Sequence, residues 1–222
     1  MDAHETTVPA MAAAWPPFAI RITSERLGLR LPTDDDLLAM IALAKAGIHP
    51  SDEMPFGVAW TDVPSPAMER SFVQHHWSAR AGWSPESWAL HLMVELDGVP
   101  IGAQSVLGTD FATNRTVRTG SWLGRPWQGR GLGREMRAAV LAFAFDGLGA
   151  ERAETDAYMD NGPSNGVSRS LGYAEDGFGT LAPRGVDRTT QRWVMTLEAW
   201  RSRPRPPVVI EGLDPCRDLF GA

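Results

Sequence analysis

The alternation of apolar and polar residues predicts strands and helices that follow one another along most of the chain. Residues 18–30 alternate loosely and predict one or two strands. Apolar positions at helical spacing follow Thr33, which together with Asp36 suits the start of a helix. Ser65-Pro66 predicts a second helix that runs to about Ala81. Further strands are expected over residues 88–96, 99–107, 116–123, 151–158, 173–182 and 188–197, and further helices over residues 132–148 and 163–170.

Two of these segments define the expected topology. Asp97-Gly98 joins two apolar runs and is a strong signal for an antiparallel hairpin. The strand over 116–123, a glycine-rich turn, a nearly all-apolar helix and the strand over 151–158 predict a right-handed βαβ unit, which makes those two strands parallel. The sequence therefore predicts a mixed α/β domain with both kinds of strand pairing.

The two ends of the chain differ in composition from its middle. Residues 1–17 contain acidic residues and no basic n-region, so we expect a disordered tail rather than a secretory signal. The main domain is expected over residues 18–200. Residues 201–222 begin with a Pro- and Arg-rich linker and are expected to form an extension that packs on the domain or on a partner subunit.

Composition limits the class of protein. The chain has 222 residues, 43% of them hydrophobic, and no apolar run reaches the roughly 20 residues that cross a bilayer. Cys216 is the only cysteine, so no intramolecular disulfide can form and a cytoplasmic location is the default expectation. The net charge of −6 disfavours nucleic acids and membranes as partners.

One segment reverses that charge. Residues 115–137 hold six arginines and a single acid, Glu135, which predicts a small anionic ligand. The glycine-rich turn lies within it, at the start of the apolar helix. Free N–H groups at a helix N-terminus bind phosphates, and glycines let a diphosphate approach the backbone. Arg130, Arg134 and Arg137 lie in the first two turns of the helix, the end that disfavours cations, which fits the same anion. The turn reads Gln128-Gly129-Arg130-Gly131-Leu132-Gly133.

Two known phosphate-binding motifs fit this turn less well. A dinucleotide-binding fingerprint has Gly-x-Gly-x-x-Gly after the first strand of a domain. A P-loop ends in Gly-Lys-Ser or Gly-Lys-Thr. The turn has neither pattern. The residues alone therefore leave two interpretations open: the turn binds a different diphosphate ligand, or it is a tight turn with solvated arginines.

A second segment completes a resemblance to a known family. The pattern Gln/Arg-x-x-Gly-x-Gly/Ala is matched by Gln128, Gly131 and Gly133, and the pattern Asn-x-x-Ser is matched by Asn161 and Ser164. Leu171-Gly172-Tyr173 then matches the family's Leu-Gly-Phe/Tyr. Over roughly residues 18–200 the chain resembles the GCN5-related N-acetyltransferase (GNAT) superfamily, and within it the RimJ/RimL-like group. The resemblance implies a mixed, mostly antiparallel twisted sheet of about seven strands flanked by helices, with a splayed parallel strand pair at the cofactor cleft.

A narrower resemblance bears on the acyl group. Residues 54–56 with Trp60, residues 120–124, residues 135–141 and the tail over 214–221 are similar to an actinobacterial branch that includes a mycobacterial succinyl-CoA transferase. This similarity implies that acetyl-CoA or another acyl-CoA, succinyl-CoA among them, is the co-substrate, and it implies no metal.

The family resemblance also implies roles for individual residues. The acyl group would pass directly from the thioester to an amine, without a covalent enzyme intermediate. The strand Ser121-Trp122-Leu123 would lend backbone groups to the pantetheine arm, and Asn161 would hydrogen-bond the arm or a nearby carbonyl. Ser168 lies where many members have a Tyr and would assist the departing thiolate. The expected cofactor-binding residues are Ser121, Trp122, Leu123, Gln128, Gly129, Arg130, Gly131, Leu132, Gly133, Arg134, Asn161 and Ser164.

The attacking amine needs a base, and several residues are candidates. Asp156 lies at a strand position where some family members have a Glu, although a surface strand acid is an equal interpretation. His49, Asp52 and Glu53 are alternatives. The loop that contains them mixes aromatic and acidic residues, which suits a cationic amine on an apolar body. Its expected acceptor-binding residues are His49, Glu53, Met54, Phe56 and Trp60.

Three functions remain in view. The leading one is an N-acyltransferase that acts on a primary amine of a small molecule, a protein N-terminus or a lysine. A non-catalytic acyl-CoA-binding or sensing module is the second, because the usual Tyr is missing and the base is uncertain. A nucleotide-binding transferase that uses the same turn is the third. The sequence also leaves a homo-oligomer open.

Overall fold

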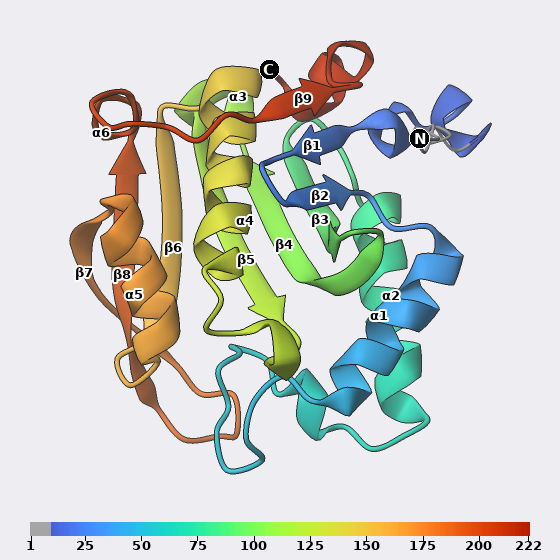
Figure 1. Cartoon of the computed structure of the whole chain (residues 1–222), viewed down its shortest axis with the longest axis vertical. Helices are drawn as coiled ribbons and strands as arrows, with labels where there is room; N and C mark the ends of the chain where they lie inside the picture. Colours follow the sequence, from blue (N-terminus) through green and yellow to red (C-terminus); the bar gives the residue numbers. More distant parts are fainter. Residues whose placement is uncertain (1–9) are drawn as a thin grey trace.

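A mixed sheet of nine strands forms the centre of the computed structural model, which describes residues 10–222 (Figure 1). The strand order is β7-β8-β6-β5-β4-β3-β2-β1-β9, and within the described residues only β5 and β6 pair in parallel. The predicted hairpin and βαβ unit are both confirmed. The strands are β1 (Arg21–Thr23), β2 (Leu27–Arg30), β3 (Ser87–Leu96), β4 (Val99–Thr109), β5 (Thr116–Leu123), β6 (Arg152–Tyr158), β7 (Ala174–Leu181), β8 (Arg188–Thr196) and β9 (Val209–Glu211).

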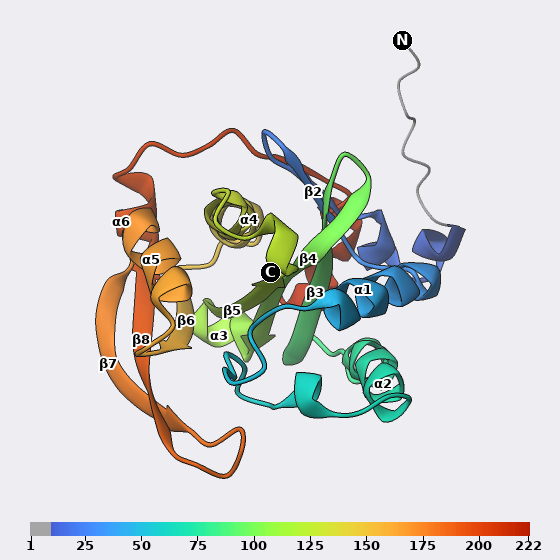
Figure 2. The same cartoon turned by 60° about the horizontal axis from the view of Figure 1, so that its bottom comes forward.

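Helices cover both faces of this sheet. Figure 2 shows α1 (Asp34–Ala46) and α2 (Ala67–Ala81) on one face and α4 (Leu132–Ala142) on the other. The short helix α5 (Gly162–Leu171) lies beside β6 and β8 (Figure 1). The larger apolar core lies beneath α4, and a smaller one lies beneath α1 and α2. Two short helices, α3 (Phe111–Asn114) and α6 (Leu197–Arg201), complete the set.

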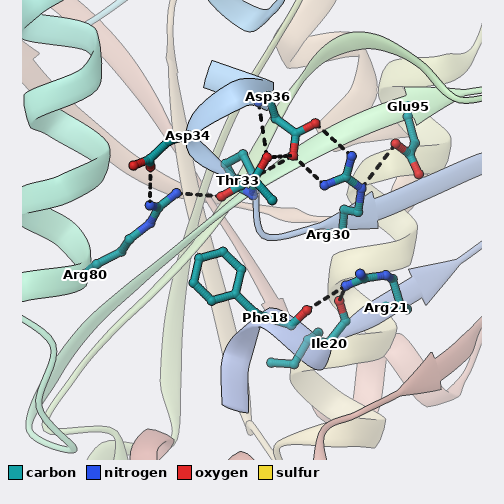
Figure 3. A network of polar contacts seen from close by, with 10 residues as sticks. Phe18, Ile20, Arg21, Arg30, Thr33, Asp34, Asp36, Arg80 and Glu95 are labelled. Carbon is teal, nitrogen blue, oxygen red and sulfur yellow. Dashed lines mark hydrogen bonds and ion pairs between the residues drawn. The ribbon is translucent and has the colours of Figure 1, made fainter. Parts of the chain in front are cut away.

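The start of α1 follows the sequence prediction. Thr33 Oγ1 accepts a hydrogen bond from Asp36 N, and the Asp36 carboxylate accepts one from Thr33 N at 2.7 Å (Figure 3). Arg30 of β2 adds two bonds to the same carboxylate, at 2.6 and 2.9 Å. Burial alone would raise the pKa of Asp36, but these bonds hold it below its usual value. The cap therefore also joins α1 to the sheet.

Two predicted segments differ from the structure. Residues 10–17 were expected to belong to a disordered tail, and that expectation is wrong because they form most of two 3-10 helices, Ala10–Ala13 and Pro16–Ala19. The Trp15 ring packs edge-on against Trp83, with ring centroids 5.8 Å apart. Residues 1–9 lie outside the described part of the chain. The helix expected over 132–148 ends at Ala142, and a π-helical turn, Phe143–Gly147, follows it.

The C-terminal segment packs on the same chain. Strand β9 pairs with β1 and extends the sheet by one strand at that edge. Leu213, Cys216 and Phe220 are buried in the main core. Among residues 10–222, no helix combines the length and apolar character needed to span a membrane.

Candidate active site

The parallel strands β5 and β6 separate after a short paired region. Their ladder covers Thr116–Arg118 and ends there, although β5 continues to Leu123. At the point of separation, the Thr155 hydroxyl still donates to Thr119 O at 2.9 Å. Beyond it, the edge of β5 that faces β6 has no ladder partner within residues 10–222. The expected splayed pair is present, and its open end leads to the glycine-rich turn.

The glycine-rich turn has a backbone that glycine favours. Gly129 and Gly131 have φ values of 71° and 78°, and Gly131 is the N-cap of α4. No atom lies within 4 Å of a Cβ built on Gly129. The turn is therefore open at Gly129, next to the N-terminus of α4, whose first N–H groups have no partner within the helix and could bind a diphosphate.

Arginines surround this turn. Arg134 is exposed, and the Arg130 guanidinium lies over the Trp127 ring, 5.1 Å from its centroid. Arg26 of the β1–β2 turn is a further cation that sequence reasoning missed, because it lies about a hundred residues away along the chain. It pairs with Glu135 at 2.6 Å and also donates to Arg130 O at 3.4 Å.

Gln128 holds the turn in place. Its amide nitrogen donates to Leu123 O and to Ile48 O, both at 2.7 Å. These bonds connect the end of β5, the turn and the loop after α1. The side-chain amide hydrogens of Gln128 are therefore used within the protein, and direct contact of this residue with a cofactor stays a prediction.

Helix α5 lines the opposite side of the opening. Asn161 Oδ1 accepts from Ser164 N at 3.1 Å and so caps α5. Ser168 is 1% exposed, and its hydroxyl donates to Ser164 O in the same helix at 3.4 Å. A Cβ on Gly133 would lie 3.7 Å from Val167, so α4 and α5 approach closely here. The structure thus brings the two family-like motifs together.

Arg137 does not join the exposed arginines of α4. It is 4% exposed, and its Nη2 donates to Ser121 Oγ of β5 at 3.2 Å. Its other two nitrogens are buried without a partner among the described residues, as are Tyr173 Oη and Gln104 Oε1. Burial raises the pKa of Tyr173, and the nearby Arg137 cation opposes that rise.

The other face of the sheet carries the expected acceptor loop. Phe56 and Trp60 pack together with ring centroids 5.3 Å apart, and Trp60 also contacts Phe72 and Trp122. His49 packs edge-on against Phe56 at 5.6 Å. Three of the predicted acceptor-binding residues are therefore brought together. Because the ring of Trp122 belongs to this face, only its backbone can serve the cofactor side.

The other two members of that prediction are placed differently. Met54 is 2% exposed, and its carbonyl accepts from Arg188 at 2.6 Å. Glu53 is exposed, and its carbonyl accepts from Arg184 at 3.3 Å. Figure 1 shows the loop beside the β7–β8 hairpin that supplies both arginines. Met54 and Glu53 therefore anchor the loop rather than form part of the aromatic cluster.

Asp156 and His91 are two groups on this face that could accept a proton. Asp156 of β6 forms an ion pair with Arg118 at 3.2 Å. His91 of β3 lies nearer the centre of the sheet, where its Nδ1 is 2.7 Å from Ser105 Oγ of β4. Ser105 is opposite Gly120 of β5, and the space above Gly120 is open to 4 Å. Burial, assisted by His75, lowers the pKa of His91 to about 4. Sequence reasoning missed His91 because its link to Gly120 depends on strand register.

Comparison with known proteins identifies the family. Residues 26–174 match the model of the Acetyltransferase (GNAT) domain. The chain belongs to the GNAT family. The match spans the glycine-rich turn, the splayed strands and α5. The chain is therefore an acyltransferase of this family, with the expected fold and a sheet two strands wider than predicted.

Solved structures share this GNAT fold at low sequence identity. Mycobacterium smegmatis RimJ in complex with CoA-disulfide is 22% identical over 85% of this chain and 88% of its own, with a TM-score of 0.64. RimL, a ribosomal L7/L12 alpha-N-protein acetyltransferase in complex with coenzyme A, is 18% identical over 79% and 97%, with a TM-score of 0.62. A GCN5-related N-acetyltransferase from Brucella melitensis is 19% identical over 82% and 80%, with a TM-score of 0.64.

Proposed function

We propose that this GNAT enzyme transfers an acyl group, acetyl or a larger one such as succinyl, from coenzyme A directly to a primary amine. The observation that carries the proposal is the open end of the β5–β6 pair beside the glycine-rich turn. A pyrophosphate on the free N–H groups of α4 places the pantetheine arm along the unpaired edge of β5. The residues proposed to hold it include Ser121, Leu123, Gly133 and Asn161.

Direct transfer is supported by the state of the only cysteine. Cys216 is fully buried, and its Sγ lies 3.2 Å from Gly212 O. Burial, together with Asp218, raises its pKa to about 11. A buried, protonated thiol is a poor acyl carrier. The amine must therefore attack the thioester itself, and catalysis depends on holding the two groups together.

Acid–base assistance is proposed on both sides of the sheet. On the acceptor side, the neutral His91 accepts the amine proton through Ser105, with Asp156 as the rival base. On the cofactor side, Ser168 is proposed as the donor to the thiolate. Its hydroxyl would have to turn from Ser164 O toward the opening. The acceptor, either a small amine or a protein amine, would enter over the Phe56–Trp60 cluster in the cytoplasm.

The buried hydroxyl of Ser168 also favours a second candidate, a module that binds acyl-CoA without transferring it. Incubation of the full chain with acetyl-CoA or succinyl-CoA and an amine panel, with free CoA as the readout, separates the two. Release of CoA that depends on an amine supports the transferase. Tight CoA binding without release for any acceptor favours the sensing module, and absence of CoA binding contradicts both.

A further inference from the structure

Arg137 is a buried cation for which residues 10–222 supply no carboxylate. Among residues 10–222, its guanidinium donates one side-chain hydrogen bond, to Ser121 Oγ, and Nε and Nη1 are buried without partners. Removing a charge from water is costly unless an opposite charge and hydrogen bonds replace the water. The ion pairs of the described chain each join another arginine, or Lys45, to an acid, and none of them includes Arg137. The surroundings of Arg137 are thus suited to one additional anion.

Further polar groups converge on the same place. Gln104 of β4 is opposite Ser121 in the ladder, so both side chains lie on the α4 face. The Tyr173 hydroxyl lies near Arg137 and Thr119, and a tyrosine hydroxyl can donate a hydrogen bond. Tyr173 Oη and Gln104 Oε1 have no partner among the described residues. Arg137 and Tyr173 therefore offer unused donors to an anion.

This cluster lies at the deep end of the proposed cofactor cleft. Ser121 is exposed and lies three residues beyond Arg118, where the β5–β6 ladder ends. Arg137 lies five residues into α4 from Leu132, or about 7.5 Å along the helix from the glycine-rich turn. An arm that starts at the turn and follows β5 toward its paired region brings its acyl end to Ser121 and Arg137.

We propose that Arg137, with Ser121 and Tyr173, binds the terminal carboxylate of a dicarboxylic acyl group carried on coenzyme A, of about the length of succinyl. This inference rests on the proposed function and adds a specificity-determining residue to it. A guanidinium can bind a carboxylate through two parallel hydrogen bonds. A neutral acyl chain of similar length would leave the buried guanidinium unpaired and would bind less well.

Binding tests this without knowledge of the acceptor. Titration of the full chain with succinyl-CoA and with butyryl-CoA compares a carboxylate with a methyl group at the end of a four-carbon chain. We expect succinyl-CoA to bind at least about 10-fold more tightly, as a charged hydrogen bond allows. Arg137→Met should remove the preference, and Arg137→Lys should keep part of it. Arg201→Met, an exposed arginine of α6, is the matched control and should keep the wild-type preference.

The outcomes separate this inference from the proposed function. Equal affinity of the wild-type protein for both ligands, or a preference that survives Arg137→Met, overturns the role of Arg137 while CoA binding itself stands. A wild-type protein that binds neither ligand nor CoA overturns the proposed function. Retained affinity for free CoA shows that Arg137→Met is folded. If Arg137→Met misfolds, the comparison of succinyl-CoA with butyryl-CoA in the wild-type protein and in Arg137→Lys still tests the role of Arg137.

Discussion

His91 Nδ1 and Ser105 Oγ lie 2.7 Å apart on the face of the sheet opposite α4. Ser105 is opposite Gly120, one residue before Ser121 in β5. The exposed His75 ring lies over His91, with centroids 4.5 Å apart. In the proposed proton route, an amine above Gly120 gives its proton through Ser105 to His91, which lies beside a histidine in contact with solvent.

Replacement of His91 tests this route. His91→Gln and Ser105→Ala should each lower kcat/KM by roughly 10²-fold, within the range for general base catalysis, and leave the Kd for CoA unchanged. Asp156→Asn is the comparison variant, because it removes the other candidate base. Steady-state rates with the best amine of the panel provide the measurement. A large loss in Asp156→Asn together with near wild-type rates in His91→Gln would assign the base to Asp156.

Much of this architecture could be predicted from local signals. The Asp97-Gly98 turn, the Thr33 cap and the strand over 116–123 depend on neighbouring residues, and the structure confirms them. The chemistry of Arg137 could not be predicted in this way. From the sequence, Arg137 was one of the six arginines of the basic segment. In the structure its side chain is buried between α4 and the sheet, whereas Arg134 of the same helix is exposed. The pairing of His91 with Ser105 likewise depends on register across β3 and β4, which composition and periodicity do not specify.

Histidine burial makes stability depend on pH. Burial, with His91, His75 and Arg80, lowers the pKa of His76 to about 3, and the pKa of His91 is about 4. Between these values and about 6.5, the unfolded chain binds protons that the folded chain does not. Stability is thus full above about pH 6.5 and falls as the pH drops toward 4.

Thermal unfolding between pH 7.5 and 5 measures this effect. We expect a loss of roughly 1–2 kcal/mol for each of the two histidines at pH 5, or several degrees in Tm. His76→Phe should flatten the pH dependence, because phenylalanine does not titrate. Leu38→Phe, a non-titrating change at an exposed position of α1, is the control and should leave the slope as it is. An identical slope in wild type and His76→Phe would contradict the assignment to His76.

A charge at the glycine-rich turn tests the pyrophosphate site. Gly131→Glu should abolish CoA binding, but its φ of 78° also strains any side chain there. Gly133 is the cleaner position, because it is helical and a Cβ would meet Val167 and Leu123 at ordinary contact distances. Gly133→Glu should weaken CoA binding by at least about 100-fold through repulsion of the diphosphate, whereas Gly133→Ala should weaken it far less. Calorimetric titration with CoA measures both affinities. Equal CoA affinities of Gly133→Glu and Gly133→Ala would exclude a phosphate at this turn.

The C-terminal segment should be essential to the stability of the domain. Phe220 is fully buried, 4.9 Å from the Trp88 ring and 5.1 Å from the Trp83 ring between centroids. Its carbonyl accepts from Trp88 Nε1 at 3.1 Å, and Leu219 O accepts from Trp83 Nε1 at 2.8 Å. Phe220→Ala should therefore lower the free energy of unfolding by about 3–5 kcal/mol, measured by urea unfolding. Leu38→Ala, at an exposed position of α1, is the control and should change it by less than about 1 kcal/mol. A Phe220→Ala variant as stable as that control would show that the segment is not part of the folded core.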